Sequence, residues 1–507
     1  MVCLSKAIFT SAIHRTTPSL PYHPPTIFSC DREARRIRAA HCNKKSRVVK
    51  HLVNPTLKPS SSLITTEGGS RGGSDELLAL CGFGYWVQGF RCFPWLALNF
   101  HLVHALSLSP STLQLIQNIG NLPMVAKPLL GVISDAVYIG DAHRLPYISI
   151  GAILQLVSWG TLALIPVTGG ETFQALITCI LLSNLGASFV EVATDALVAE
   201  FSRTRSAGQL QSYAFIALAA GAMLGNLSSG FTLLKTQEPK ILFFIFALLL
   251  CVQITLSLTT KESSLHLPTT PNHTLICNSL AENLSKQFSD LVTAINEEAI
   301  AYPLSWIVAS VAIVPILTGS MFCFQTQYLN IDPAIIGLSK VVGQLVVLLA
   351  TFIYDHYLKR IPMRRLLFGA QILYALALLS DLVLVKQVNV KLGISNEVYV
   401  LCLSGLAEAI AQFKILPFTV LFSHLCPSGC EGSLFAFLTS AMCLSSILSG
   451  ILGVGVATLI GVSSGDYSNL PIGIVVQFIA ALVPLGWISY IPLTRNEEMV
   501  VAKRSKG

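Results

Sequence analysis

Charge is scarce in this sequence. Of its 507 residues only 12% are charged, whereas 53% are hydrophobic and the mean hydropathy is +0.66. Soluble domains carry about 25% charged residues, so this composition excludes a soluble enzyme or a nucleic-acid-binding domain. A transmembrane helix needs about 20 apolar residues, and the chain has room for about a dozen. The apolar runs are continuous and lack the alternation of barrel strands, so we expect an all-α polytopic membrane protein.

The sequence also lacks the residue spacings that mark reactive sites. Its thirteen cysteines are scattered, and Cys426 and Cys430 have no nearby His or Cys that would complete a zinc site. No nucleophile–base pair and no cofactor fingerprint is present. We therefore expect a protein that is not an enzyme and that needs no cofactor, metal or nucleic acid.

Residues 1–75 lack the apolar segment of a secretory signal. They hold twelve of the 33 Lys and Arg residues but only four acids, so a net charge of +8 falls here and −1 on the rest of the chain. The segment is also rich in Ser, Thr and Pro. These features predict a plastid transit peptide in a disordered leader. A mitochondrial presequence and a basic cytosolic tail are the alternatives.

Twelve apolar segments bounded by Pro, Gly or charge predict twelve transmembrane helices. They lie at 80–100, 112–133, 147–166, 173–195, 209–231, 240–259, 303–325, 333–354, 365–385, 397–420, 433–460 and 472–493. The polar linker 260–302 separates an N-terminal half, 76–259, from a C-terminal half, 303–495, which is followed by the tail 496–507. Lys and Arg number 13 in the tail and the loops on the linker side but 4 in the opposite loops, which predicts both termini on the same, positive side.

The two halves repeat one feature. Asp135 follows the second predicted helix and precedes Arg144 by nine residues, and Asp355 follows the eighth and precedes Arg364 by nine. Six-helix halves repeated in parallel resemble the organisation of major facilitator transporters, whose substrate site lies near the midplane between the halves. We expect these four residues to act in gating, by binding neighbouring helix ends in one access state. Simple helix termination with positive-inside charge is the alternative.

Charged residues inside the predicted helices are few: the cations Arg91, Lys127, Lys340 and Lys414, and the acids Glu191, Asp195 and Glu408, with Asp381 nearer a helix end. Each would cost at least about 2.5 kcal/mol at a helix centre, so we expect them to face the interior of the bundle. Glu191 and Asp195 are four residues apart on one helix face, where repulsion favours a proton on one of them. This predicts proton coupling at Glu191, Asp195 and Glu408, with Asp195 as the deeper member of the pair. A structural ion pair, for example with Lys127, is the alternative.

Arg91 lies close in sequence to Tyr85 and Trp86 in the first predicted helix. A guanidinium near aromatic rings suits a flat heteroaromatic ligand that bears a carboxylate, by bidentate hydrogen bonding and stacking. We therefore expect Arg91, Tyr85 and Trp86 to bind substrate. For aromatic residues near helix ends, a role as interfacial anchors is the alternative.

Four stretches are similar to the folate-biopterin transporter family of the major facilitator superfamily. They are Ala126-Lys-Pro-Leu-Leu-Gly-Val-Ile-Ser-Asp135, Arg144-Leu-Pro-Tyr147, Glu191-Val-Ala-Thr-Asp-Ala-Leu-Val-Ala-Glu200 and Leu425-Cys-Pro-Ser-Gly-Cys-Glu-Gly-Ser-Leu-Phe-Ala436. The resemblance covers about 80–495 and implies transport of folates or related pterins with proton coupling. Plant members of the family include plastid envelope proteins. One departure is Asp141-Ala-His-Arg-Leu-Pro146, which keeps one arginine where family members commonly carry a run.

From this resemblance we expect a proton-coupled carrier of folate or a similar pterin in the inner envelope membrane of plastids. Folate has two glutamate carboxylates that need cationic partners, and Arg91, Lys127 and Lys414 are the candidates. The alternatives are a carrier of another aromatic organic anion and a membrane sensor that binds its ligand without transporting it.

Overall fold

The computed structural model describes residues 68–137, 139, 142, 144–164, 170–204, 207–260, 292–293, 296–358, 361–425 and 431–491. Nearly all of them are helical, and within these ranges extended pairing is limited to two isolated bridges, Ile139 with Ala142 and Ser463 with Asp466. The predicted all-α fold is therefore confirmed. The predicted leader up to residue 67, most of the linker and the tail lie outside the described residues.

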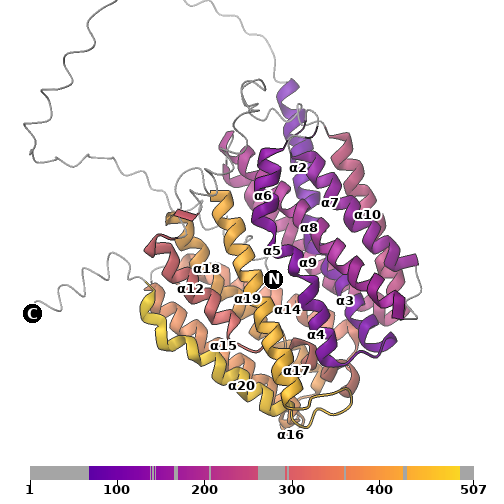
Figure 1. Ribbon diagram of the computed structural model, residues 1–507, viewed down its shortest axis with the longest axis vertical. Coiled ribbons are helices and arrows are strands. Elements are labelled where there is room, and N and C mark those ends of the chain that lie inside the picture. The colour runs from indigo at the N-terminus through magenta and orange to yellow at the C-terminus, as the bar shows by residue number, and fades with distance from the viewer. Residues whose placement is uncertain are drawn as a thin grey trace, which may run out of the picture.

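The helices of the two halves form two groups that lie side by side, indigo to magenta and orange to yellow in Figure 1. The first half contains α2 Gly68–Phe90, α3 Cys92–Phe100, α4 Pro110–Gly120, α5 Leu122–Val125, α6 Lys127–Ala136, α7 Leu145–Leu164, α8 Gly170–Thr204, α9 Ala207–Thr236 and α10 Pro239–Thr259. The second contains α12 Glu298–Ala312, α13 Thr318–Cys323, α14 Pro333–His356, α15 Met363–Val385, α16 Val388–Lys391, α17 Asn396–Leu403, α18 Leu406–Leu425, α19 Glu431–Leu459 and α20 Leu470–Leu482. A 3₁₀-helix, Val483–Tyr490, follows α20.

By length and composition, nine helical segments in the described ranges could each cross a membrane. They occupy the third to sixth and the eighth to twelfth predicted spans. The first, second and seventh predicted spans hold interrupted helices, namely α2 with α3, α4 with α5 and α6, and α12 with α13. The outer faces expose large apolar side chains such as Ile216, Leu248 and Leu349, as contact with lipid requires.

Proline accounts for the interruptions. Pro94 lies in the first turn of α3, just after the break at Arg91, and Pro315 lies in the gap between α12 and α13. Pro123 and Pro128 lie at the starts of α5 and α6. Proline has no N–H to continue the helical ladder, so each break frees a carbonyl group. Inside a membrane such carbonyls are tolerated only where protein or a water-filled cavity surrounds them, so these breaks belong to the interior of the bundle.

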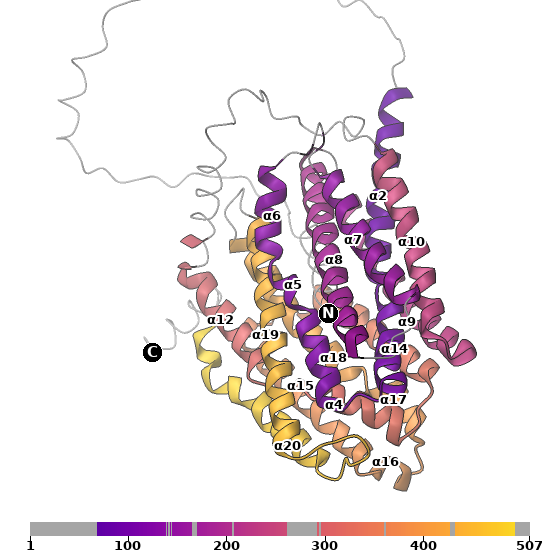
Figure 2. The ribbon, with the colours of Figure 1, turned by 45° about the vertical axis from the view of Figure 1, so that its right-hand side comes forward.

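The halves meet along two seams. In one seam α9 packs against α14, and in the other α4, α5 and α6 pack against α19. Figure 2 shows α19 running beside α4 and α6. Glycine permits the close approach in each seam: a Cβ on Gly337 would lie 2.5 Å from the carbonyl oxygen of Asn226, and one on Gly450 would overlap the side chain of Asn118. The fifth predicted helix thus meets the eighth and the second meets the eleventh, as two related six-helix halves require.

Candidate functional site

Three predicted charges form one buried cluster in the first half. Glu191, on α8, accepts from Arg91 Nη1 at 3.1 Å through one carboxylate oxygen and from Lys127 Nζ through the other. The exposed fractions of these side chains are 3%, 11% and 2%, respectively. One carboxylate therefore compensates two cations away from water, which is an arrangement that is costly to break.

Both cations of this cluster lie at breaks between helices. Arg91 is the turn residue between α2 and α3, and Lys127 is the first residue of α6. Arg91 Nη2 also donates to Asn184 Oδ1 at 2.6 Å, and Asn184 Nδ2 donates to the carbonyl of Gly120 at the end of α4, at 2.6 Å. The cluster of Arg91, Lys127, Glu191 and Asn184, called the charge cluster below, thus joins the first, second and fourth predicted helices.

The two carboxylates of α8 have different partners. Asp195 Oδ1 accepts from Tyr85 Oη at 2.6 Å, whereas Glu191 takes the two cations. Glu191 is buried and Asp195 is partly exposed, so the expectation that Asp195 is the deeper of the two is wrong. The reason is that α8 continues to Thr204, which leaves Glu191 one turn further from its end. The ion pair with Lys127, predicted as the alternative, is present.

The aromatic residues near Arg91 pack mainly on one another. The ring of Trp86 stacks on Phe83 and Phe90, with centroids 5.9 and 4.9 Å apart, and is partly buried against the apolar core. Tyr85 uses its hydroxyl on Asp195. The structure therefore brings Tyr85, but not the ring stack of Trp86, into a polar interaction with a predicted site residue.

Lys414, on α18, is a buried cation with neutral partners. Its Nζ donates to Gln371 Oε1 at 3.0 Å and lies 4.9 Å from the centroid of the Tyr374 ring. Gln371 is itself anchored, because its Nε2 donates to the carbonyl of Ala481 at 2.5 Å. Among the described residues no carboxylate forms an ion pair with Lys414, so its positive charge is uncompensated by any described acid.

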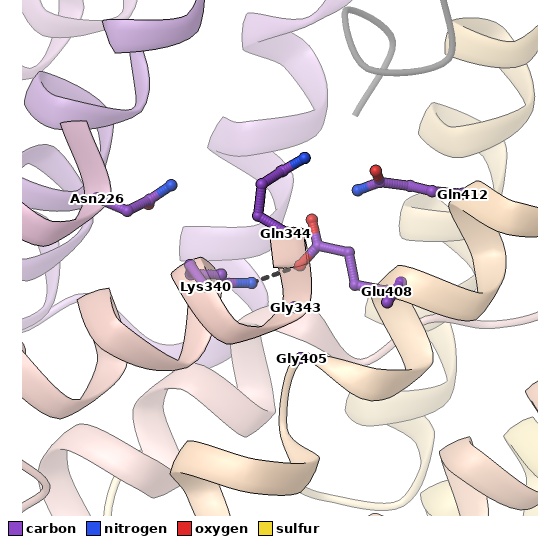
Figure 3. A pocket seen from close by; sticks show the side chains of 8 residues that line it. Asn226, Lys340, Gly343, Gln344, Gly405, Glu408 and Gln412 are labelled. Atoms are coloured by element: carbon purple, nitrogen blue, oxygen red, sulfur yellow. Dashed lines mark hydrogen bonds and ion pairs between the residues drawn. The ribbon is translucent and has the colours of Figure 1, made fainter. Parts of the chain in front are cut away.

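Lys340 and Glu408 form a more accessible pair in the second half. Lys340 Nζ donates to Glu408 Oε2 at 2.6 Å, and the two side chains are 40% and 35% exposed. They line a pocket together with Asn226, Gly343, Gln344, Gly405, Ala409 and Gln412 (Figure 3). Asn226 comes from α9 of the first half and the others from α14, α18 and the turn before α18. From the sequence, Lys340 is recognised as a charged residue within a predicted helix, but no function is predicted for it. The neutral amide residues of this pocket cannot be recognised from the sequence.

The predicted gating arginines both bind near helix ends. Arg144, buried, donates to Ser134 Oγ of α6 at 2.8 Å, and Tyr147 of α7 donates to the carbonyl of Val137 at 2.8 Å. Arg364, at the start of α15, donates to the carbonyls of Ser489 and Ile491, at 2.6 Å for Ser489. The side chains of Asp135 and Asp355 lie outside what the structure describes, so the gating role stays a prediction.

Comparison with known proteins agrees with this architecture. The sequence matches the BT1 family over residues 88–505. It is 53% identical over 436 residues to "Probable folate-biopterin transporter 9, chloroplastic" of Arabidopsis thaliana, covering 85% of this chain and 81% of that protein. It is 54% identical over 434 residues to "Probable folate-biopterin transporter 8, chloroplastic" of the same plant, covering 86% and 78%.

The fold is also found among solved transporters. The crystal structure of a D-xylose-proton symporter has a TM-score of 0.58 at 16% sequence identity, with 84% of this chain and 99% of that one covered. This similarity establishes a major facilitator fold. The family expected from the four sequence motifs is confirmed: the chain belongs to the BT1 family.

Proposed function

We propose that this multi-pass membrane protein is a secondary transporter that carries folate or a related pterin by alternating access. The observation that carries the proposal is the 53% identity, over 85% of the chain, with a plant protein named a folate-biopterin transporter. The two seams between the halves support it, because each can open or close as the halves rock about a central site. The charge cluster and Lys414 supply the cationic groups that an anionic substrate needs near that site.

For proton coupling we propose Asp195 as the group that exchanges the proton. It is partly exposed, and its carboxylate accepts from the hydroxyl of Tyr85, a neutral donor that a protonated carboxyl can keep through its other oxygen. Glu191 bridges two cations, and a proton there would cost both interactions. These different surroundings support separate roles for the two carboxylates.

For location we propose the inner envelope membrane of plastids, with residues 1–75 as the import signal and both termini in the stroma. Support comes from the basic, Ser/Thr-rich leader and from the word "chloroplastic" in the names of the two plant relatives. A fusion of residues 1–75 to a fluorescent reporter should enter plastids, whereas the reporter alone should stay in the cytosol. Mitochondrial or diffuse fluorescence of the fusion would reject this location.

Uptake into proteoliposomes tests the transport proposal. Purified protein should give counterflow of labelled folate or biopterin that empty liposomes lack, and an inward proton gradient should drive accumulation. Counterflow of p-aminobenzoate or another aromatic anion without folate or pterin would favour the alternative carrier. Binding of folate without any counterflow would favour a sensor.

A further inference from the structure

The pocket around Lys340 and Glu408 is built from two matching helix faces. Lys340 and Gln344 are four residues apart on α14, and Glu408 and Gln412 are four residues apart on α18, so each helix presents one charged side chain and one amide on one face. A Cβ on Gly343 would lie 3.2 Å from the carbonyl oxygen of Gly405, so the two backbones approach closely beneath these side chains. The close approach fixes the relative positions of the four polar groups.

Two amide atoms of this pocket have no partner within the described part of the chain. They are Gln344 Nε2, a donor, and Gln412 Oε1, an acceptor, and both are buried. Leaving a buried amide atom unpaired costs about 1–3 kcal/mol. Figure 3 shows the Gln344 and Gln412 side chains directed toward the same space beside the Lys340–Glu408 pair. Unpaired groups of both kinds, converging next to an ion pair, mark a place for a ligand that has both donors and acceptors.

The charge of the pocket selects which part of a substrate fits. Lys340 and Glu408 together are neutral, whereas the charge cluster has two cations for one carboxylate and Lys414 has no described acidic partner. The neutral Lys340–Glu408 pair offers no net positive charge to the anionic glutamate tail of a folate, whereas the charge cluster and Lys414 do. The neutral pteridine ring has no net charge to repel and suits the neutral pocket.

The ring edge also has the matching hydrogen-bonding pattern. A 2-amino-4-oxopteridine presents two adjacent N–H donors, at N3 and the 2-amino group, followed by a carbonyl acceptor. A carboxylate accepts two parallel N–H bonds, and an ammonium group donates to a carbonyl. We infer that the pocket formed by Lys340, Gln344, Glu408 and Gln412 binds the 2-amino-4-oxo edge of the pteridine ring. Glu408 accepts from the two N–H groups and Lys340 donates to the carbonyl oxygen.

Two further observations support this assignment, which rests on the proposed function. The side chains of Lys340 and Glu408 are 40% and 35% exposed, so a ligand can reach them. Asn226 of the first half also lines the pocket. A ring bound here contacts both halves, so its binding energy can differ between the two access states, as coupling of binding to transport requires.

The test compares ligands that differ only in the ring edge. Binding of folate and of 2-deaminofolate, which lacks the 2-amino group, is measured on purified protein for the native chain, Glu408→Gln and Glu397→Gln. Glu397 is exposed at the start of α17 and provides the matched control. The native protein should prefer folate by about tenfold to a hundredfold, the range for one charge-assisted hydrogen bond. Glu408→Gln should lose that preference, and Glu397→Gln should keep it.

A second variant guards against a loss of folding in Glu408→Gln. Gln412→Met leaves the ion pair intact and should weaken folate and biopterin about equally, by about threefold to tenfold, because both carry the same ring. Equal affinity of the native protein for folate and 2-deaminofolate would overturn the inference, as would a preference that persists in Glu408→Gln. If the native protein binds neither folate nor biopterin, the proposed function itself fails, which is a distinct result.

Discussion

At the scale of single residues, Glu191 on α8 forms ion pairs with cations from the first and second predicted helices. It lies between Arg91 and Lys127, and all three side chains are nearly removed from water. Removing Glu191 should reduce the free energy of unfolding more than removing Lys127. Without Glu191 two cations lose their shared carboxylate, whereas without Lys127 a neutral Arg91–Glu191 pair is left. Breaking a buried pair by removing one partner typically costs about 3–5 kcal/mol.

Glu191→Gln should therefore reduce stability by about 3–5 kcal/mol, and Lys127→Met should cost clearly less. The measurement is the thermal unfolding midpoint of each purified variant in detergent, together with its yield. A larger loss in Lys127→Met than in Glu191→Gln would show that the Lys127 stem, not the charge balance, stabilises the cluster.

Asp195→Asn should abolish uphill accumulation while substrate exchange persists. The amide mimics the neutral acid and can still accept from Tyr85, but no proton can be exchanged at this position. The assay is gradient-driven uptake and substrate–substrate exchange on the same proteoliposomes. Asp332→Asn, at an exposed aspartate before α14, is the control. Normal accumulation by Asp195→Asn would remove this residue from coupling.

The sequence picks out the charged residues within the helices and offers a pair with Lys127 as an alternative, but it does not reveal the other pairs. Spacing places Glu191 and Asp195 on one face, yet it cannot show that Arg91 approaches Glu191 from a helix a hundred residues away. That pairing depends on how α2, α6 and α8 pack. Neutral amide residues such as Asn184 and Gln412 cannot be identified as site residues from the sequence. Placing an amide in an apolar membrane helix costs far less free energy than placing a charge there, so its presence does not by itself indicate a function.

At the scale of helices, the breaks provide binding sites for other helices. Gln114 on α4 donates from Nε2 to the carbonyls of Ile316 and Gly450, at 2.5 and 2.8 Å, and its Oε1 accepts from the N–H of Gly319 at 3.0 Å. One side chain of the first half thus binds the α12–α13 break and α19 of the second. It lies toward the end opposite the predicted linker side, where these contacts hold the halves together.

Gln114→Leu should make the seam between α4 and the second half open more often at this end of the molecule. Cys323 on α13, the helix that contains Gly319, is fully buried, so its alkylation by a maleimide reports opening. Loss of three hydrogen bonds across the seam should raise the labelling rate by about tenfold, which corresponds to about 1.4 kcal/mol. Gln117→Leu is the matched control, since Gln117 lies on the same helix and binds Asn99 within the first half. Equal labelling in both variants would reject the seam role.

Gly337→Ala should destabilise the other seam. The new Cβ would lie 2.5 Å from the carbonyl oxygen of Asn226, which forces α9 and α14 apart at a cost of about 1–3 kcal/mol. Gly455→Ala on α19 is the comparison, because a Cβ there meets nothing within 4 Å, and alanine favours a helix over glycine. Unfolding midpoints should fall for the first variant and stay level or rise for the second. A level midpoint for Gly337→Ala would show that the seam can relax.

Helix positions follow from hydropathy, but the interruptions do not. The segment 112–133 has the length of one span, and only the structure shows that it contains α4, α5 and α6. Pro123 and Pro128 are visible in the sequence, yet proline is tolerated within membrane helices when neighbours bind the freed carbonyls. Whether neighbours such as Asn184 and Ser440 do so is a property of packing.

At the scale of the whole molecule, two features go together. The two halves pack through corresponding helices, and the Lys and Arg residues of the loops are concentrated on one predicted side. The seams pair the second predicted helix with the eleventh and the fifth with the eighth. The predicted twelve spans would place both termini on the side that holds 13 of the 17 Lys and Arg residues counted in loops and tail. Positive loops resist translocation, so this side should be the compartment from which the chain is inserted.

The topology predicts where a tag can be detected. A short fragment of a split fluorescent protein, fused after Gly507 or inserted after Lys391, is expressed with the complementary fragment confined to the stroma. Lys391 ends α16, which lies between α15 and α17 on the side opposite the predicted termini. Because the positive side should face the stroma, the tag at Gly507 should give fluorescence and the tag at Lys391 none, at equal protein abundance by immunoblot. The reverse result would invert the orientation, and fluorescence from both positions would require an even number of spans between them.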